Sequence, residues 1–410
     1  MKDTSLYQQI LGDTSPWSVD NVELNAEKLT IEVRMVLPPV TVWGCVKCNC
    51  RMHVKEWRER RWRHMDSCQF KTILVASVPV VECPEHGAQT VQVPWAEGSS
   101  RYTLLFERFA IEVLLACNTE RAGELLDITW DQADGIKQRA VIRGMAKRPA
   151  LDIEYVCVDE KAVGHGHDYV TIVTGLVDRK QAVLYVGDGK GEQGLNGFWE
   201  QLGPEGCKRI KAISMDMGKS YIKSALKYCP NAELIFDPFH IMKMINEAVN
   251  EVRRQEVVMG SGKDRIMLKK TQHLWLWGEE NLPQRYADRF DELKESTLKT
   301  ARAWRIKELW RTFKNCVDMA DGVSFFKKWY RVAMVSKLEP MKKVAHSLQK
   351  HLSGIVAYLK HGFCNAIAES MNSRIQLLVQ KACGYRNRER LKTDIMFHFG
   401  GLDLNPVFVQ

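Results

Sequence analysis

Two aspartates in the middle of the chain follow short runs of β-branched and aromatic residues. Asp159 ends the run YVCVD (155–159), and Asp216 ends the run ISMD (213–216). If these runs are neighbouring strands, the two carboxylates meet at the edge of the sheet where open α/β proteins place their sites. Carboxylates at such an edge could hold Mg²⁺ or Mn²⁺, and two such ions catalyse phosphodiester cleavage. Either aspartate alone is equally compatible with an ordinary turn, so the prediction depends on the pair.

A third carboxylate is expected from NAIAESMNSRIQLLVQKACGY (365–385), whose pattern predicts a helix. Its apolar positions recur at helical spacing and would be buried: Met371, Ile375, Leu378 and Ala382. Glu369 begins a second stripe, which continues through Asn372 and is rich in amide side chains. Such a face suits a helix that lines a metal and phosphate site. Arg374 and Arg386 would add a basic surface for the phosphates of the DNA backbone.

The elements that must position these acids follow from the same segment. Runs at 155–160, 169–178 and 181–189 predict three strands joined by short turns. After them we expect a helix at 195–202, a strand ending at 217, a helix at 220–227, a strand at 232–237 and a helix at 241–254. This order is that of the ribonuclease-H-like α/β fold, in which the first and fourth strands lie side by side. From about residue 261 to residue 362 the pattern predicts long, charged helices.

The segment DPFH (237–240) offers two accessory candidates. Asp237 ends the last predicted strand, and His240 opens the next helix close to the expected metals. His240 could contact DNA or transfer protons. An aspartate that caps a helix beside a packed histidine explains the same residues equally well.

Cysteines cluster near the N-terminus in a pattern typical of a zinc site. Cys45 and Cys48 form one short-spaced pair, and Cys83 and His86 form another. Tetrahedral Zn²⁺ takes four such ligands, two from each turn. Two unrelated pairs remain an alternative, and Cys50 or Cys68 could replace one of the four. The basic run between the pairs, RMHVKEWRERRWRH (51–64), is interpreted as a DNA-backbone surface or as one face of a hairpin.

A helix-turn-helix is expected after residue 118. Two helices are joined by a turn near Ile128, and Thr129 with Gln132 predicts a capping box at the start of the second helix. The second helix could enter a major groove. Its candidate DNA-contacting side chains are Lys137, Gln138, Arg139 and Arg143.

Composition agrees with a nucleic-acid partner without requiring one. The 410 residues include 59 Lys and Arg against 50 Asp and Glu, which leaves a net charge of +9. A basic excess favours polyanions, although many basic proteins bind none. We expect no secretory signal and no membrane span. The 12 cysteines are too dilute for a disulfide scaffold, and together these features predict a soluble, intracellular protein.

With these residues assembled, the sequence resembles bacterial insertion-sequence transposases of the ISL-three family, which are DDE transposases. The resemblance covers nearly the whole chain and rests on blocks such as VDEKAVGHGHDYVTIV (158–173), MDMGKSY (215–221), DPFHIMK (237–243) and AESMNSRI (368–375). It implies catalytic acids at Asp159, Asp216 and Glu369. In the first cysteine pair CVKCNC replaces the family's more usual CPxCG, which leaves the zinc ligand set open.

The resemblance also implies a domain order. We expect a zinc-binding, DNA-contacting domain (1–100), a helix-turn-helix (101–150), the first part of the core (151–257), the helical insertion (258–362) and the last part of the core (363–410). The expected activity is binding of terminal inverted repeats in double-stranded DNA, metal-dependent cleavage, and transfer to target DNA by a homodimer or larger assembly. The alternatives are a transposon-derived DNA-binding regulator without catalysis and a repair nuclease of the same fold.

Overall fold

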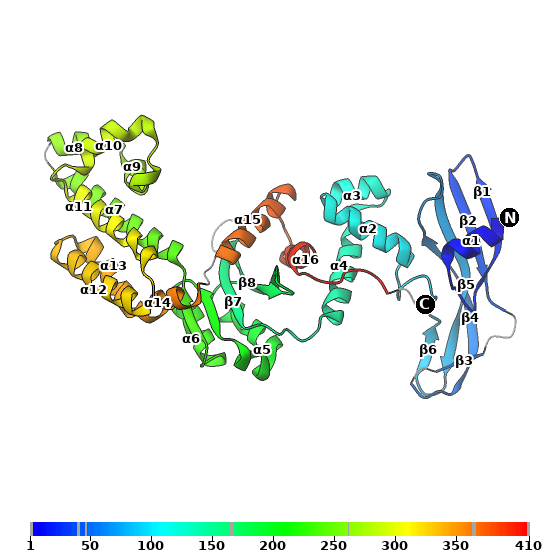
Figure 1. The fold of residues 1–410 in the computed structure, drawn as a ribbon. Helices are drawn as coiled ribbons and strands as arrows, with labels where there is room; N and C mark the ends of the chain where they lie inside the picture. Colours follow the sequence, from blue (N-terminus) through cyan, green and yellow to red (C-terminus); the bar gives the residue numbers. More distant parts are fainter. Residues whose placement is uncertain are drawn as a thin grey trace. The chain divides into compact units, whose positions relative to one another are not determined.

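A computed structural model describes residues 3–38, 42–45, 47–163, 168–260, 262–362 and 366–407. The chain forms two compact units (Figure 1). Unit 1 comprises Met1–Arg148 together with Leu402–Gln410, and unit 2 comprises Pro149–Gly401. Among the described residues, no helix combines the length and the apolar composition that crossing a membrane requires.

Unit 1 contains a sheet followed by three helices. Its elements are α1 (Asp3–Leu11), β1 (Ser18–Asn25), β2 (Thr30–Val36), β3 (Trp43–Gly44), β4 (Arg51–Arg63), β5 (Lys71–Cys83), β6 (Gly87–Thr90), α2 (Leu104–Ala116), α3 (Thr119–Leu126) and α4 (Trp130–Lys147). The strand order is β1-β2-β5-β4-β3, and β6 pairs with β5. β5 is buried along most of its length, which reflects its central place in the sheet.

The sheet and the helices of unit 1 pack together rather than separating at residue 100. The backbone N–H of Thr103 donates to the carbonyl of Arg63 at 3.0 Å. The side chain of Thr103 is hydrogen-bonded to Nδ1 of the buried His64 at 2.9 Å. Trp95 contacts Trp62 edge to face, with ring centroids 5.4 Å apart. The predicted boundary at 100 therefore divides two subregions of a single unit.

Unit 2 begins with the elements β7 (Tyr155–Ala162), β8 (Tyr169–Val177), β9 (Lys180–Asp188), α5 (Glu192–Arg209), β10 (Ala212–Met215), α6 (Lys219–Tyr228), β11 (Glu233–Phe236) and α7 (Pro238–Met259). The sheet order is β11-β10-β7-β8-β9, so the predicted neighbours β7 and β10 do lie side by side. They pair in parallel, whereas β8 is antiparallel to both β7 and β9.

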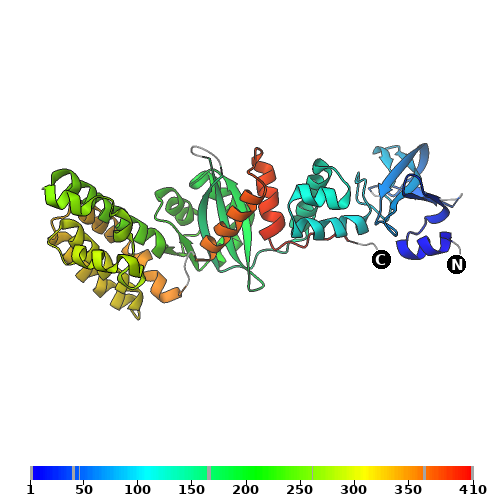
Figure 2. The same cartoon turned by 90° about the horizontal axis from the view of Figure 1, so that it is seen from above.

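Different helices cover the two faces of this sheet. Val156 and Ile213 point to the face that packs against Phe198 of α5. Ala212 and Ile235 point to the opposite face, toward α14 (Leu352–His361). Figure 2 shows α15 (Ala366–Lys381) and α16 (Arg388–Phe399), in orange and red, beside the green strands. The acidic residues described below lie on the face that α14 and α15 cover.

Between α7 and α14 the chain is helical, as expected for the insertion. This part contains α8 (Gly262–Leu268), α9 (Gln272–Leu276), η1 (Glu279–Asn281), η2 (Gln284–Tyr286), α10 (Ala287–Lys294), α11 (Lys299–Arg311), η3 (Thr312–Asn315), α12 (Met319–Val335) and α13 (Glu339–Lys350). Edge-to-face contacts join Trp275 to Phe290 and Phe290 to Trp304. Aromatic burial of this kind holds short helices that would be marginal alone.

The C-terminal tail corrects one predicted boundary. Residues from Leu402 onward belong to unit 1 and not to the last part of the core, which was expected to extend from 363 to 410. The guanidinium of Arg143 donates to the carbonyl of Leu404 at 2.7 Å, and Lys147 donates to the carbonyl of Asn405 at 2.6 Å. These contacts attach the tail to α4.

Candidate functional site

Three aspartates lie level with one another on three neighbouring parallel strands. The register pairs Cys157 with Ser214, so Asp159 and Asp216, each two residues further on, lie at the same height. Met215 pairs with Phe236, which places Asp237 beside Asp216. Level residues on parallel strands point to the same face of the sheet. The strand pairing thus brings three carboxyl groups to one sheet edge.

Local backbone geometry fixes each of these carboxyl groups. One oxygen of Asp159 accepts from the N–H of Glu160 at 2.8 Å, and one of Asp216 accepts from the N–H of Gly218 at 2.9 Å. Asp237 is the N-cap of α7 and accepts from the N–H of Phe239 at 3.1 Å. The second oxygens of Asp159 and Asp237 contact Asn372 and His240, respectively. The side chains are therefore held before any ligand binds.

Helix α15 adds a fourth carboxyl group and an amide. Asn372 donates through Nδ2 to Oδ2 of Asp159 at 2.7 Å. Glu369 lies one turn earlier on α15. Burial raises the pKa of Glu369, and the nearby charges of Asp237 and Asp159 raise it further. The helix predicted from residues 365–385 thus brings its acid to the aspartates, 153 residues after Asp216 in the sequence.

His240 completes the group. Its Nδ1 lies 3.0 Å from Oδ2 of Asp237. This hydrogen bond raises the pKa of His240 in spite of partial burial, and the charges of Asp216 and Asp159 act in the same direction. Asp237 therefore both caps α7 and holds His240. This is the cap beside a packed histidine that the sequence allowed, whereas a role of His240 in DNA contact or proton transfer stays a prediction.

The electrostatics of the acidic group suit a divalent cation. Burial raises the pKa of Asp159 to about 6, and the charges of Asp237 and Asp216 add to the effect. Crowded carboxylates of this kind need a proton or a cation to balance their charge. The donor set is oxygen-rich, as Mg²⁺ and Mn²⁺ prefer. Asp159, Asp216 and Glu369, the expected ligands, therefore have the donor chemistry that such an ion prefers.

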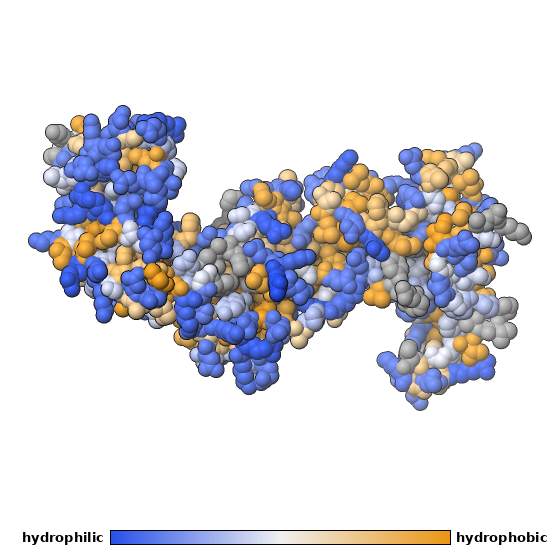
Figure 3. Space-filling view, in the orientation of Figure 1, coloured by the Kyte–Doolittle hydropathy of each residue, from blue (hydrophilic) through white to orange (hydrophobic). Residues whose placement is uncertain are grey.

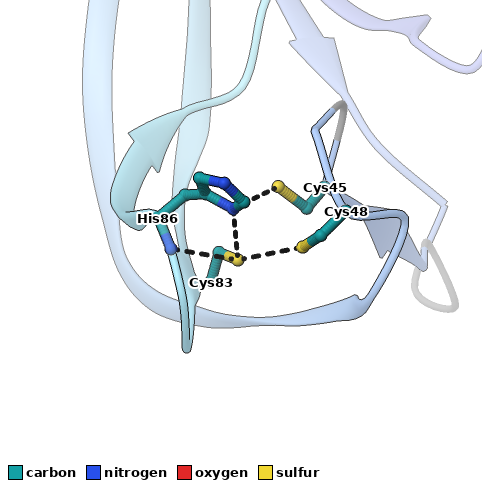
Figure 4. A group of neighbouring side chains, drawn as sticks. All are labelled: Cys45, Cys48, Cys83 and His86. Carbon is teal, nitrogen blue, oxygen red and sulfur yellow. Dashed lines mark hydrogen bonds between the residues drawn. The ribbon is translucent and has the colours of Figure 1, made fainter.

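The second candidate metal centre lies in unit 1 and has a different chemistry. Ligand atoms of Cys45, Cys48, Cys83 and His86 all lie within 4.8 Å of one another (Figure 4). Nδ1 of His86 is 3.6 Å from the sulfur of Cys45 and 3.5 Å from that of Cys83. Zn–S bonds of ~2.3 Å in a tetrahedron imply ligand separations of roughly 3.8 Å. The four predicted ligands therefore fit a structural zinc ion.

Cys50 lies beside this cluster without belonging to it. Its sulfur is 3.1 Å from that of Cys48 and 3.4 Å from that of Cys83. The backbone carbonyl of Cys50 accepts from the N–H of Cys45 at 2.9 Å, but the four ligand atoms that all lie within 4.8 Å of one another do not include the sulfur of Cys50. Cys68 is exposed in a turn outside the cluster. The geometry thus favours the predicted set of ligands over the alternatives with Cys50 or Cys68.

The two helices and their turn are as predicted, but most of the basic side chains expected to contact DNA are buried or paired. The capping box of Thr129 and Gln132 is present at the start of α4. Lys137 and Arg143 are buried, and Arg139 is engaged with the buried Glu107 at 2.5 Å. These side chains hold unit 1 together, so the expected major-groove contacts by Lys137, Arg139 and Arg143 need correction. Gln138 remains on the exposed face of α4.

Glu107 is the structural residue that sequence reasoning missed. It lies on α2, is 1% exposed, and accepts hydrogen bonds from Ser100, Arg139 and Arg143. The one available signal was an acid within the apolar run TLLFERFA (103–110). A buried carboxylate needs such partners because an unpaired buried charge is costly. Glu107 therefore explains why the basic residues of α4 turn inward.

The exposed surface of α2, α3 and α4 carries several large apolar side chains. Figure 3 shows hydrophobic side chains gathered over α2, α3 and α4. Exposed examples are Phe109, Leu125, Trp130 and Ile142.

The predicted DNA-contacting arginines of unit 2 differ from those of α4. Arg374 and Arg386 are both exposed. Arg374 lies over the ring of Phe399 at 4.8 Å, and the exposed side of its guanidinium can face phosphate.

The basic run of β4 is largely neutralised by neighbouring strands. Arg61 pairs with Glu32 of β2 at 2.5 Å, and Lys55 pairs with Glu82 of β5 at 2.9 Å. Trp62 is buried in the core, whereas Trp57 is 54% exposed. The pairing favours the interpretation of this run as one face of a hairpin, with Trp57 as its exposed aromatic residue.

Comparisons with known proteins agree along the whole chain. Residues 156–395, more than half of the chain, match the ISL3 family model described as a transposase. Residues 41–86 match the zinc finger of transposases IS204, IS1001, IS1096 and IS1165, and residues 91–141 match the helix-turn-helix domain of transposase family ISL3.

Two relatives show the same extent of similarity. The transposase for insertion sequence element IS1001 of Bordetella parapertussis is 26% identical over 407 residues, covering 98% of this chain and 99% of the relative. The transposase for IS1557 of Mycobacterium tuberculosis is 24% identical over 435 residues, covering 98% and 96%. The chain therefore belongs to the ISL3 family of transposases, with an N-terminal zinc ribbon and a helix-turn-helix domain.

Proposed function

We propose that this transposase binds the terminal inverted repeats of an insertion sequence, cleaves DNA strands there, and joins the ends to target DNA. The observation that carries the proposal is the convergence of Asp159, Asp216 and Glu369 beside Asp237 and His240. A protein that only binds DNA has no use for four crowded carboxyl groups, which cost stability. The strand order and the helical insertion support a ribonuclease-H-like core.

Asp159, Asp216 and Glu369 would hold two Mg²⁺ or Mn²⁺ ions, with Asp237 beside them. Such ions activate a water or 3′-hydroxyl nucleophile and stabilise the leaving oxygen of a phosphodiester. Asn372 positions Asp159 through its 2.7 Å hydrogen bond. The bond between Nδ1 of His240 and Asp237 leaves Nε2 for a proton or a hydrogen bond to DNA.

DNA binding would be shared between the units. In unit 1 the zinc ribbon would order the sheet, and Gln138 on α4 is the remaining candidate for groove contacts. In unit 2 Arg374 and Arg386 would contact phosphates. Because two ends of an element must be joined, we propose a homodimer or larger assembly on DNA. Its place of action would be the bacterial nucleoid.

The test compares two aspartate substitutions of the same chemistry. Asp216→Asn should abolish nicking of labelled DNA that carries the element ends, in Mg²⁺ or Mn²⁺, and should leave end binding intact. Asp178→Asn is the matched control, because Asp178 is an exposed turn residue with φ of 49°, a conformation that asparagine tolerates. It should nick normally. Binding without nicking by the wild-type protein would favour the regulator instead.

A further inference from the structure

A pocket of about 290 Å³ lies in unit 2 between α7 and α9. The aromatic ring of Phe239 forms one wall, together with Met242 of α7 and Leu276 of α9. Phe239 is 62% exposed, which is unusual for a phenylalanine on a well-packed helix. Small-molecule pockets in proteins begin at about 300 Å³, so the space suits one flat group.

Amide side chains give this pocket a polar wall. Asn246 and Asn250 of α7 and Gln272 of α9 line it. The side-chain oxygen of Asn246 is buried and has no hydrogen-bond partner among the described residues. A buried acceptor of this kind costs free energy unless a ligand satisfies it. Amides offer a donor and an acceptor side by side, which is the pattern that base edges present.

Helix α7 connects the acidic site to the pocket. Phe239 comes two residues after Asp237, the N-cap of this helix. Phe239 and Asn250 are separated by eleven positions, or ~16 Å of helix, which equals roughly five base steps of DNA. Figure 1 shows α7 extending from the sheet into the helical insertion. A strand that runs along α7 from the acids would therefore pass the pocket.

Two charged residues complete the lining. Lys243 is exposed at the pocket and can contact a backbone phosphate, whereas Glu247 can accept from an exocyclic amino group. A face of Phe, amides and one lysine is the combination that binds single bases by stacking and edge hydrogen bonds. An apolar peptide would leave the amides unpaired.

We propose that this pocket binds one unpaired nucleobase of the element end, taken out of the duplex close to the cleaved phosphate. The proposal rests on the proposed transposase function and adds a base-binding site to it. Phe239 would stack on the base, and Asn246 would hydrogen-bond its edge. Removing the base from the stack would also bend the strand toward the acids.

The experiment uses the full chain with Ca²⁺ and duplexes of the element end that carry 2-aminopurine at successive positions. We expect a severalfold rise in fluorescence at one position near the cleavage site. Phe239→Ala and Asn246→Leu should abolish the rise. Val258→Ala is the control, because Val258 is 80% exposed on α7 outside the pocket, and it should behave as the wild type.

Nicking in Mg²⁺ gives a second readout. Phe239→Ala should slow nicking of the intact duplex about 10-fold, as expected for the loss of one base–aromatic stack. An abasic site at the same position needs no stacking and should remove the difference between the variant and the wild type. Normal binding and nicking without a rise in fluorescence at any 2-aminopurine position would refute the base-binding pocket but not the transposase function. The same holds if Phe239→Ala slows nicking equally on the intact and the abasic duplex. A protein that neither binds nor nicks the ends would overturn the proposed function and the pocket together.

Discussion

At the scale of single residues, Asn372 links the helix α15 to the acids of the sheet. Its Nδ2 donates to Asp159 at 2.7 Å, and its Oδ1 is buried without a partner among the described residues. Groups that orient metal ligands typically contribute about 10- to 100-fold to metal affinity or activity. We predict that Asn372→Leu, which keeps the size but not the donor, lowers the nicking rate by about that factor and shifts its Mn²⁺ dependence to higher concentration.

The control for this prediction is the adjacent position on the same helix. The hydroxyl of Ser373 is exposed and donates to the backbone carbonyl of Glu369 at 3.0 Å. Ser373→Ala should leave the Mn²⁺ titration unchanged. Equal losses in both variants would show that Asn372 acts only through the stability of α15.

A second residue prediction concerns pH. Burial lowers the pKa of His64 to about 4, and the charge of Arg63 lowers it further. The unfolded chain, with a histidine pKa of about 6.5, binds more protons than the folded chain between these values, so stability falls as pH falls through this window. Through His64, the free energy of unfolding should fall by about 1 kcal/mol between pH 7 and pH 5.5.

The measurement is hydrogen exchange of peptides from unit 1 at the two pH values, corrected for intrinsic rates. His64→Asn should reduce the pH dependence by that amount, because asparagine does not titrate. His53→Asn, at an exposed position of β4, should leave it unchanged. An identical pH dependence in the wild type and His64→Asn would refute the assignment.

At the scale of elements, local sequence patterns predicted the helices and strands better than they predicted contacts between residues far apart in the sequence. The strands β7, β8 and β9 lie where β-branched runs predicted them, because burial alternates or persists within each run. The predicted end of a helix at Leu202 agrees with α5, in which Gly203 has the non-helical φ and ψ of 73° and 167° and a separate helical segment follows up to Arg209. The burial of the Arg143 side chain could not be predicted, because its partners Glu97 and Glu107 are far from it in the sequence.

The turn between α3 and α4 gives a prediction at this scale. A Cβ at Gly123 would come within 2.9 Å of the backbone oxygen of Ile128, so the turn would have to move. A Cβ at Gly135 meets nothing closer than the guanidinium of Arg139 at 3.6 Å. Both glycines lie inside helices, so alanine gains similar helix propensity at each, about 0.5–1 kcal/mol.

The steric clash at Gly123 should decide whether each substitution stabilises or destabilises unit 1. We expect Gly123→Ala to destabilise unit 1 by about 1–3 kcal/mol and to weaken binding of the element ends. Gly135→Ala should be neutral or slightly stabilising. Thermal unfolding and end binding of the two variants would measure the difference. A stabilised Gly123→Ala would mean that the turn is not constrained by Ile128.

At the scale of the whole molecule, the chain passes between its units twice. It enters unit 2 after Arg148 and returns to unit 1 at Leu402. Sequence order alone assigned the tail to the core, because α16 precedes it directly. The contacts of Arg143 and Lys147 with the tail, 256 to 261 residues apart in the sequence, were not visible in any local pattern. Unit 2 is therefore an insertion into unit 1 in the topological sense.

This topology predicts where a C-terminal truncation acts. A chain that ends at Gly401 loses the carbonyl partner of the buried Arg143 and uncovers Gly144, which lies against Leu402. A buried guanidinium without its acceptor costs about 1–3 kcal/mol. We expect faster hydrogen exchange in α4 and α2 and unchanged exchange in β7–β9. A chain that ends at Val407 keeps these contacts and should match the full-length protein. Equal acceleration in both units, or none in α4, would mean that the tail does not stabilise unit 1.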